Sequence, residues 1–194
     1  MNHIPVTGQL AGTQIGGEAL LNSELIRERF GSYHVDVLRR TGDTRVSALS
    51  SEDGGLRVCR TFAVTQFMPG HTRIDAQVLQ QIEDGGSIGA TLRRAGIEVD
   101  KQSLEISEVS LDVDGHPALE RMRIDAPAVL AQHIYTLGIR GDSDASPFAI
   151  IAELHHPDFL TGLRLNELFE LSPERSRVAF SLESLRAEVF QTAT

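Results

Sequence analysis

The chain has 194 residues, which is enough for one well-buried domain and short for two. Apolar residues make up 41% of it and charged residues 23%, as in ordinary globular proteins, and no apolar run reaches the ~18 residues of a membrane-spanning helix. The net charge of −9 argues against binding to nucleic acid. We therefore expect neither nucleic acid nor a membrane among its partners, and the sequence leaves the oligomeric state open.

The single cysteine and the first residues of the chain indicate the compartment. Cys59 has no partner for an internal disulfide, and its apolar strand neighbours favour an inert core thiol over a nucleophile. Residues 1–17 lack the basic and apolar regions of a secretory signal. These features predict a cytoplasmic protein.

The N-terminal third begins with an arm and then alternates between helix and strand. Residues 1–16 have no apolar period, and we interpret them as a flexible arm before a single domain over residues 17–194. Apolar residues recur at helical spacing over residues 17–30, which predicts a helix that ends at Gly31. The alternation in residues 33–40 predicts a strand.

A hairpin and a helix pair follow. The β-rich runs 44–51 and 56–67 flank the turn sequence EDGG, which predicts an antiparallel hairpin. In residues 72–86 the apolar side chains fall on one face of a predicted helix, which stops at Gly85. Ser87 then caps a predicted short helix that continues through Ala95.

The second half is predicted to be strand-rich with a helical tail. Residues 103–113 alternate as a strand, and residues 125–132 are interpreted as a short helix with an early proline. Residues 134–141 and 148–156 form a predicted strand pair, and the segments after them have helical patterns. Consecutive hairpins predict an α+β fold, a single mostly antiparallel sheet with helices packed mainly on one face.

Glu153 is the first candidate for a functional side chain. It follows a strand that is apolar on both faces, where a carboxylate is costly to bury unless it is paired or protonated. A pocket acid or base with a shifted pKa is one interpretation, and a strand-end glutamate that reaches solvent or an arginine is the other.

A second candidate site combines an arginine with a glycine-rich helix start. Arg45 has the planar guanidinium that binds carboxylates through two parallel hydrogen bonds, but it also fits a solvated strand position. Gly85, Gly86 and Gly89 would let a carboxylate reach backbone N–H groups at the helix start, or they mark a plain turn between two helices.

Other kinds of site have less support. The segment ELHHPD offers Glu153, His155, His156 and Asp158 as metal ligands, but the two adjacent histidines of a strand point to opposite faces. We therefore expect no metal. Ser/His/Asp hydrolase chemistry is not favoured either.

Three motifs in order resemble the chorismate lyase family and its sibling fold, the UTRA ligand-binding domain. They are an arginine-led hairpin with the return strand Cys59-Arg60-Thr61, then Ile88-Gly89 with Leu92 at a helix start, and lastly Glu153 with Pro157. The resemblance extends over about residues 44–160 and implies a chorismate lyase-like fold. The two histidines after Glu153 replace an apolar stretch of the family pattern.

The resemblance implies a small aromatic carboxylate as ligand. Arg45 and the backbone N–H of Ile88, beside Gly89, would bind its carboxylate, and Glu153 would face the opposite end of the ring. The implied activity is a lyase that eliminates pyruvate from chorismate, with Glu153 and Arg45 as catalytic residues and without metal or organic cofactor. The alternative functions are a non-catalytic UTRA-like sensor and an inactive family member kept for protein contacts.

Overall fold

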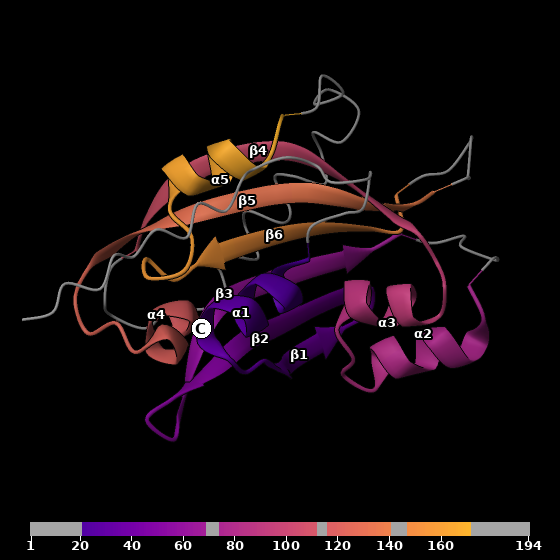
Figure 1. Ribbon diagram of the computed structural model, residues 1–194, viewed down its shortest axis with the longest axis horizontal. Coiled ribbons are helices and arrows are strands. Elements are labelled where there is room, and N and C mark those ends of the chain that lie inside the picture. Colours follow the sequence, from indigo (N-terminus) through magenta and orange to yellow (C-terminus); the bar gives the residue numbers. More distant parts are fainter. Residues whose placement is uncertain (1–20, 69–73, 112–115, 141–146, 172–194) are drawn as a thin grey trace, which may run out of the picture.

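The predicted fold class is confirmed by a computed structural model, which describes residues 21–68, 74–111, 116–140 and 147–171. Its centre is a six-stranded, fully antiparallel sheet with the order β1-β2-β3-β6-β5-β4 (Figure 1). The strands are β1 (His34–Thr41), β2 (Thr44–Asp53), β3 (Leu56–Phe67), β4 (Val99–Leu111), β5 (Ala128–Ile139) and β6 (Ala149–His155). The helices are α1 (Asn22–Phe30), α2 (Ala76–Glu83), α3 (Ile88–Arg94), α4 (Pro117–Met122) and α5 (Gly162–Leu168).

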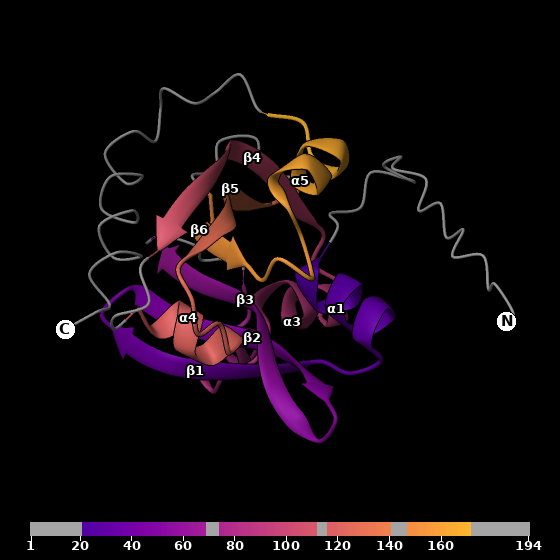
Figure 2. The same ribbon diagram turned by 90° about the vertical axis from the view of Figure 1, so that its left-hand side faces the viewer.

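The two faces of the sheet are covered unequally, as the alternation of apolar residues predicts. Phe62, Ile150 and Leu154 point to one face and pack with α4. Ala63 and Ile151, one position away in the same strands, point to the other face, where α1, α2, α3 and α5 pack. Figure 2 shows α1, α3 and α5 on one side of the sheet and α4 on the other. Most of the helical cover, and the candidate site with it, therefore belongs to one face.

The predicted hairpin is confirmed, and its turn explains two glycines. Strands β2 and β3 pair antiparallel as far as Asp53 and Leu56. Gly54 and Gly55 between them have φ angles of 55° and 79°, in the left-handed region that glycine adopts at low cost.

The short helix predicted for residues 125–132 is wrong. The helix of this region is α4, which begins at Pro117, and residues from Ala128 onward form β5. Leu130 and Ile134 of β5 belong to the core beside α4, and Ala131 and Tyr135 belong to the cores of the other face, so both faces of this strand are buried. Such a segment lacks the alternation by which a strand is recognised. The predicted arm and the second helix of the C-terminal tail lie outside the described residues.

Among the described residues, none of the helices is long and apolar enough to cross a membrane. Cys59 lies in the core at 2% exposure, and burial raises the pKa of its thiol to about 12. A thiolate is therefore disfavoured in the folded protein, in agreement with the expected inert thiol.

The junction between α2 and α3 needs glycine because the chain folds closely onto itself there. Gly85 has a φ of 106°, and a Cβ on Gly86 would lie 2.6 Å from the Gln81 carbonyl oxygen. The Gly86 N–H donates to that same oxygen at 2.9 Å.

We expect Gly86→Ala to lower the free energy of unfolding by about 1–3 kcal/mol, because backbone must move to admit the methyl group. Gly138→Ala is the matched control, since its Cβ would lie 3.9 Å from the nearest atom, the Asp100 carbonyl oxygen. Urea unfolding of both variants measures the difference. Equal stability of the two would show that the junction relaxes without cost.

Candidate functional site

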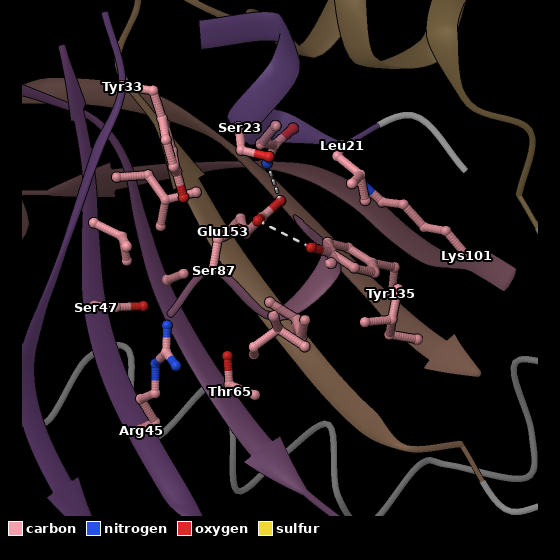
Figure 3. A pocket seen from close by; sticks show the side chains of 18 residues that line it. Leu21, Ser23, Tyr33, Arg45, Ser47, Thr65, Ser87, Lys101, Tyr135 and Glu153 are labelled. Carbon is pink, nitrogen blue, oxygen red and sulfur yellow. Dashed lines mark hydrogen bonds between the residues drawn. The ribbon is translucent and has the colours of Figure 1, made fainter. Parts of the chain in front are cut away.

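A small cavity lies between the helix-covered face of the sheet and the starts of α1 and α3. Its volume is about 60 Å³. Figure 3 shows its polar side chains converging from several elements. Its lining includes Asn22, Tyr33, Arg45, Ile88, Gly89, Lys101, Tyr135 and Glu153. The four sequence-predicted site residues, Arg45, Ile88, Gly89 and Glu153, thus all line one cavity.

Arg45 enters the cavity from β2 and is only partly satisfied by the protein. Its Nη1 donates to the carbonyl oxygens of Ile82 at 2.9 Å and Gly86 at 3.0 Å, which ties the sheet to the α2–α3 junction. Its Nε is buried without a hydrogen-bond partner in the described part of the chain. Burial also lowers the pKa of the guanidinium, although the group stays charged at neutral pH. The Nε–H group of the buried Arg45 guanidinium is therefore left to donate to an acceptor in the cavity.

Tyr33, the residue before β1, brings a second buried donor that the sequence analysis did not select. Its hydroxyl is buried without a described partner at hydrogen-bond distance, although the Ser87 side chain is close enough to act on its pKa against the effect of burial. Burial raises the pKa of this phenol, so the hydroxyl keeps its proton and can donate it. Its position directly before a strand gave no signal that the ring turns inward.

Glu153 lies at another wall of the cavity and is fully engaged by its neighbours. Its Oε2 accepts from Asn22 Nδ2 at 2.6 Å, and its Oε1 accepts from the Tyr135 hydroxyl at 3.0 Å. Burial raises the pKa of the Glu153 carboxyl, although Lys101 and these two hydrogen bonds act in the opposite direction. The carboxyl group is thus a buried, oriented acid rather than the solvent-exposed glutamate of the alternative interpretation.

Lys101 is the only lysine of the sequence, and it also lines the cavity. Its Nζ lies 3.9 Å from the centre of the Tyr135 ring and 4.3 Å from that of Phe169, as in cation–π contacts. Burial lowers the pKa of this amine to about 8, although Glu153 acts in the opposite direction. The alternation of side chains along β4 is enough to place Lys101 on the helix-covered face of the sheet. The sequence does not show which strand pairs with β4, so the neighbours of Lys101 could not be predicted.

The lowered pKa of Lys101 makes stability depend on pH in a defined window. The unfolded amine has a pKa of about 10.4, so between about pH 8 and 10.4 the unfolded chain binds more protons than the folded chain. The stability of the wild type should therefore rise with pH across this window relative to Lys101→Met. Urea unfolding at several pH values, with a chelator present, measures the difference, and parallel curves for the two proteins would contradict the prediction.

Ile88 and Gly89 have a more modest role than the resemblance implies. Ile88 begins α3, which has only seven residues, and the Ser87 side chain at its N-cap makes no capping hydrogen bond. A Cβ on Gly89 would lie 2.5 Å from Leu21 Cδ2. The glycine therefore lets α3 pack closely against Leu21, another residue of the cavity lining.

Two buried histidines lie beside Glu153 on the same face of the sheet. His133 is the direct partner of Glu153 in the β5–β6 pairing, and His155 follows Glu153 by two positions. His133 Nε2 lies 2.9 Å from Ser103 Oγ, and His155 Nδ1 lies 3.1 Å from Thr61 Oγ1. Burial lowers the pKa of both imidazoles, that of His155 to about 3, so both rings are neutral at pH 7.

Comparison with protein-family models gives no match, and comparison with curated proteins gives none either. Among solved structures, the C-terminal domain of PhnF is 15% identical with a TM-score of 0.45, over 76% of this chain and 78% of that chain. The ligand-binding domain of a protein from Bordetella bronchiseptica, described as a GntR-family transcriptional regulator, is 14% identical with a TM-score of 0.43, over 66% of this chain and 87% of that one. A GntR-family regulator from Enterococcus faecalis is 11% identical with a TM-score of 0.40, over 67% and 93%.

At these identities and TM-scores the likeness concerns the fold alone, and the predicted α+β class rests on the strand order of this chain. The expected activity, a lyase that eliminates pyruvate from chorismate or acts on a related aromatic acid, is contradicted. The similar structures include transcriptional regulators and a ligand-binding domain of one, not lyases. The cavity gives a physical reason, because about 60 Å³ is less than half of the ~150 Å³ that accommodates benzene.

Proposed function

We propose that this chain is a non-catalytic module that binds a small organic carboxylate in the cavity between α1, α3 and the sheet. The observation that carries the proposal is that two residues of the cavity lining have a buried donor, Arg45 Nε and the Tyr33 hydroxyl, with no described acceptor at hydrogen-bond distance. A buried donor without a partner costs about 1–3 kcal/mol, and more when it is charged. A carboxylate beside Arg45 would satisfy its Nε, and a second acceptor on the same ligand would satisfy the Tyr33 hydroxyl.

Charge supports an anion rather than a neutral ligand. Arg45 and Lys101 both line the cavity, and Glu153 is the acidic residue among its lining. Burial raises the pKa of Glu153, which lowers the cost of protonating its carboxyl group when an anion binds nearby. The Asn22 Oδ1 atom, buried and without a partner in the described part of the chain, adds an acceptor for a hydroxyl or amide of the ligand.

Size favours a compact ligand. A volume of about 60 Å³ holds a few water-sized groups, because one such group needs about 10–15 Å³ measured in this way. We therefore favour a carboxylate of a few carbon atoms over an aromatic acid. The aromatic carboxylate implied by the resemblance would require Leu21 or the start of α1 to move outward.

Titration calorimetry with a graded series of acids tests the proposal, with chelator present throughout. Acetate, pyruvate, succinate and 4-hydroxybenzoate serve as probes, and the corresponding primary amides serve as uncharged controls. We expect saturable binding of one of the compact acids and no binding of its amide. The single variants Tyr33→Phe and Arg45→Ala should each lose this binding. Tighter binding of 4-hydroxybenzoate than of all compact acids would overturn the size argument. Equal binding of acid and amide would contradict the proposal that the ligand is a carboxylate.

A further inference from the structure

We propose that His133, His155 and Glu153 form a binding site for a divalent transition metal ion of the Zn²⁺ or Fe²⁺ class. The ligand atoms of these three residues all lie within 4.8 Å of one another. All three side chains are almost fully buried, with exposures of 0%, 0% and 3%. Two imidazoles and one carboxylate are a common ligand set for both ions.

The unpartnered atoms of the two imidazoles are the second observation. His133 Nδ1 and His155 Nε2 are buried and make no hydrogen bond to any described residue. On each ring the other nitrogen is next to a hydroxyl, Ser103 Oγ or Thr61 Oγ1. A hydroxyl that accepts the ring N–H leaves a lone pair on the opposite nitrogen. This is the arrangement in which metal-binding histidines are usually held.

The distances fit a metal better than they fit a hydrogen bond. His155 Nε2 lies 3.8 Å from Glu153 Oε2, which is too long for a hydrogen bond. Ligands about 2.1 Å from a tetrahedral ion lie roughly 3.4 Å from one another. Small rotations of the three side chains would therefore bring them to a common ion.

Surrounding groups orient the three side chains. The His133 ring centre lies 4.6 Å from that of Phe169 and 4.9 Å from that of Tyr135, and the His155 ring lies 5.9 Å from Phe159. Asn22 and Tyr135 hold the Glu153 carboxyl group. Such aromatic walls and outer hydrogen bonds limit access of water and fix ligand orientation.

Among the described residues, Lys101 is the nearby group whose charge opposes a cation. Its charge acts on Glu153, His133 and His155. A positive charge close to the site weakens metal binding, so removing it in Lys101→Met should tighten binding by several-fold. A merely structural cluster of histidines would not respond in this way.

The sequence offers Glu153 and His155 as ligands but predicts no metal, because the adjacent His155 and His156 point to opposite faces. The structure supplies the missing histidine from the neighbouring strand, where His133 lies opposite Glu153. His156, by contrast, accepts from the Asp158 N–H at 3.0 Å after the end of β6. The pairing of β5 with β6 is therefore what assembles the site.

The test titrates chelator-treated wild type with ZnCl₂ and, separately, with CoCl₂ as a spectroscopic substitute. We expect one equivalent of Zn²⁺ to bind, and His133→Asn and His155→Asn to weaken binding at least 100-fold. His34→Asn is the matched control, because His34 is a surface histidine that lies 3.2 Å from Glu52. Binding that is unchanged in the two inner variants, or equally reduced in the control, would overturn the proposal.

A second measurement on the wild type avoids variants that fail to fold. Two-dimensional ¹H–¹⁵N spectra of the imidazole rings report which nitrogen binds a metal. We expect Zn²⁺ to shift Nδ1 of His133 and Nε2 of His155 and to leave the His34 nitrogens unchanged. Shifts confined to surface histidines, or no saturable binding of either metal, would show that these nitrogens are only buried. Because the carboxylate titrations contain chelator, failure of the metal site and failure of the proposed function are separate results.

Discussion

Arg45→Ala is expected to abolish carboxylate binding and to lower the free energy of unfolding by about 2–5 kcal/mol. The stability loss follows because the carbonyl oxygens of Ile82 and Gly86 lose the hydrogen bonds from Arg45 and a void is left beside the sheet. The loss of affinity follows because a buried, charge-assisted contact to a ligand typically contributes about 2–5 kcal/mol, which is roughly 30-fold or more in affinity. Urea unfolding and titration calorimetry measure the two effects.

Arg60→Ala is the matched control for this variant. Arg60 is as buried as Arg45, at 4% exposure against 3%, but it does not line the cavity. Its Nε donates to Ser51 Oγ at 2.8 Å, and its guanidinium lies 4.0 Å from the centre of the Phe30 ring. We expect this variant to lose stability and keep carboxylate affinity. If both variants lost affinity to the same degree, the effect would come from the fold and not from the cavity.

Phe62→Ala is expected to lower the free energy of unfolding by about 3–5 kcal/mol. Phe62 lies in β3, between Ala48 of β2 and Leu154 of β6, and is 1% exposed. Truncation would leave a cavity at the centre of the sheet, where neighbouring strands prevent collapse. Thermal and urea unfolding measure the loss.

Phe67→Ala is the comparison for Phe62. Phe67 ends β3, is half-buried, and packs against Phe148 with ring centres 5.6 Å apart. We expect a clearly smaller loss there, because water already reaches part of the ring. An equal loss at the two positions would mean that the end of β3 is as tightly packed as its centre. The folded fraction of Phe62→Ala should retain carboxylate affinity, since Phe62 and the cavity lie on opposite faces.

The local parts of the fold could be predicted from the sequence. The β2–β3 hairpin was recognisable because its turn requires two glycines with positive φ, and the end of α2 because Gly85 stops the helical pattern. Strand β5 was not fully recognised, since a strand buried on both faces shows no alternation. Its first residues were therefore assigned to a helix.

The candidate site was predictable only in part, for a related reason. Glu153 was selected because a carboxylate in an apolar strand is unusual within its own segment, and Arg45 because the resemblance gives it a role. Tyr33, Lys101 and His133 are ordinary within theirs. They become significant only through long-range pairing and helix packing, which bring them next to residues distant in sequence. No local pattern contains that information.

The strand order has a consequence for the rates of folding and unfolding. Strands β1-β2-β3 and β4-β5-β6 are two meanders joined along a single seam, where β3 pairs with β6. The seam brings together residues as distant as Thr61 and His155, and the closure of such a long loop is slow. Arg45 belongs to the first meander and Glu153 to the second, so the cavity exists only after the seam has closed. A bound carboxylate should then slow unfolding while leaving the refolding rate nearly unchanged, because it stabilises contacts that form after the transition state.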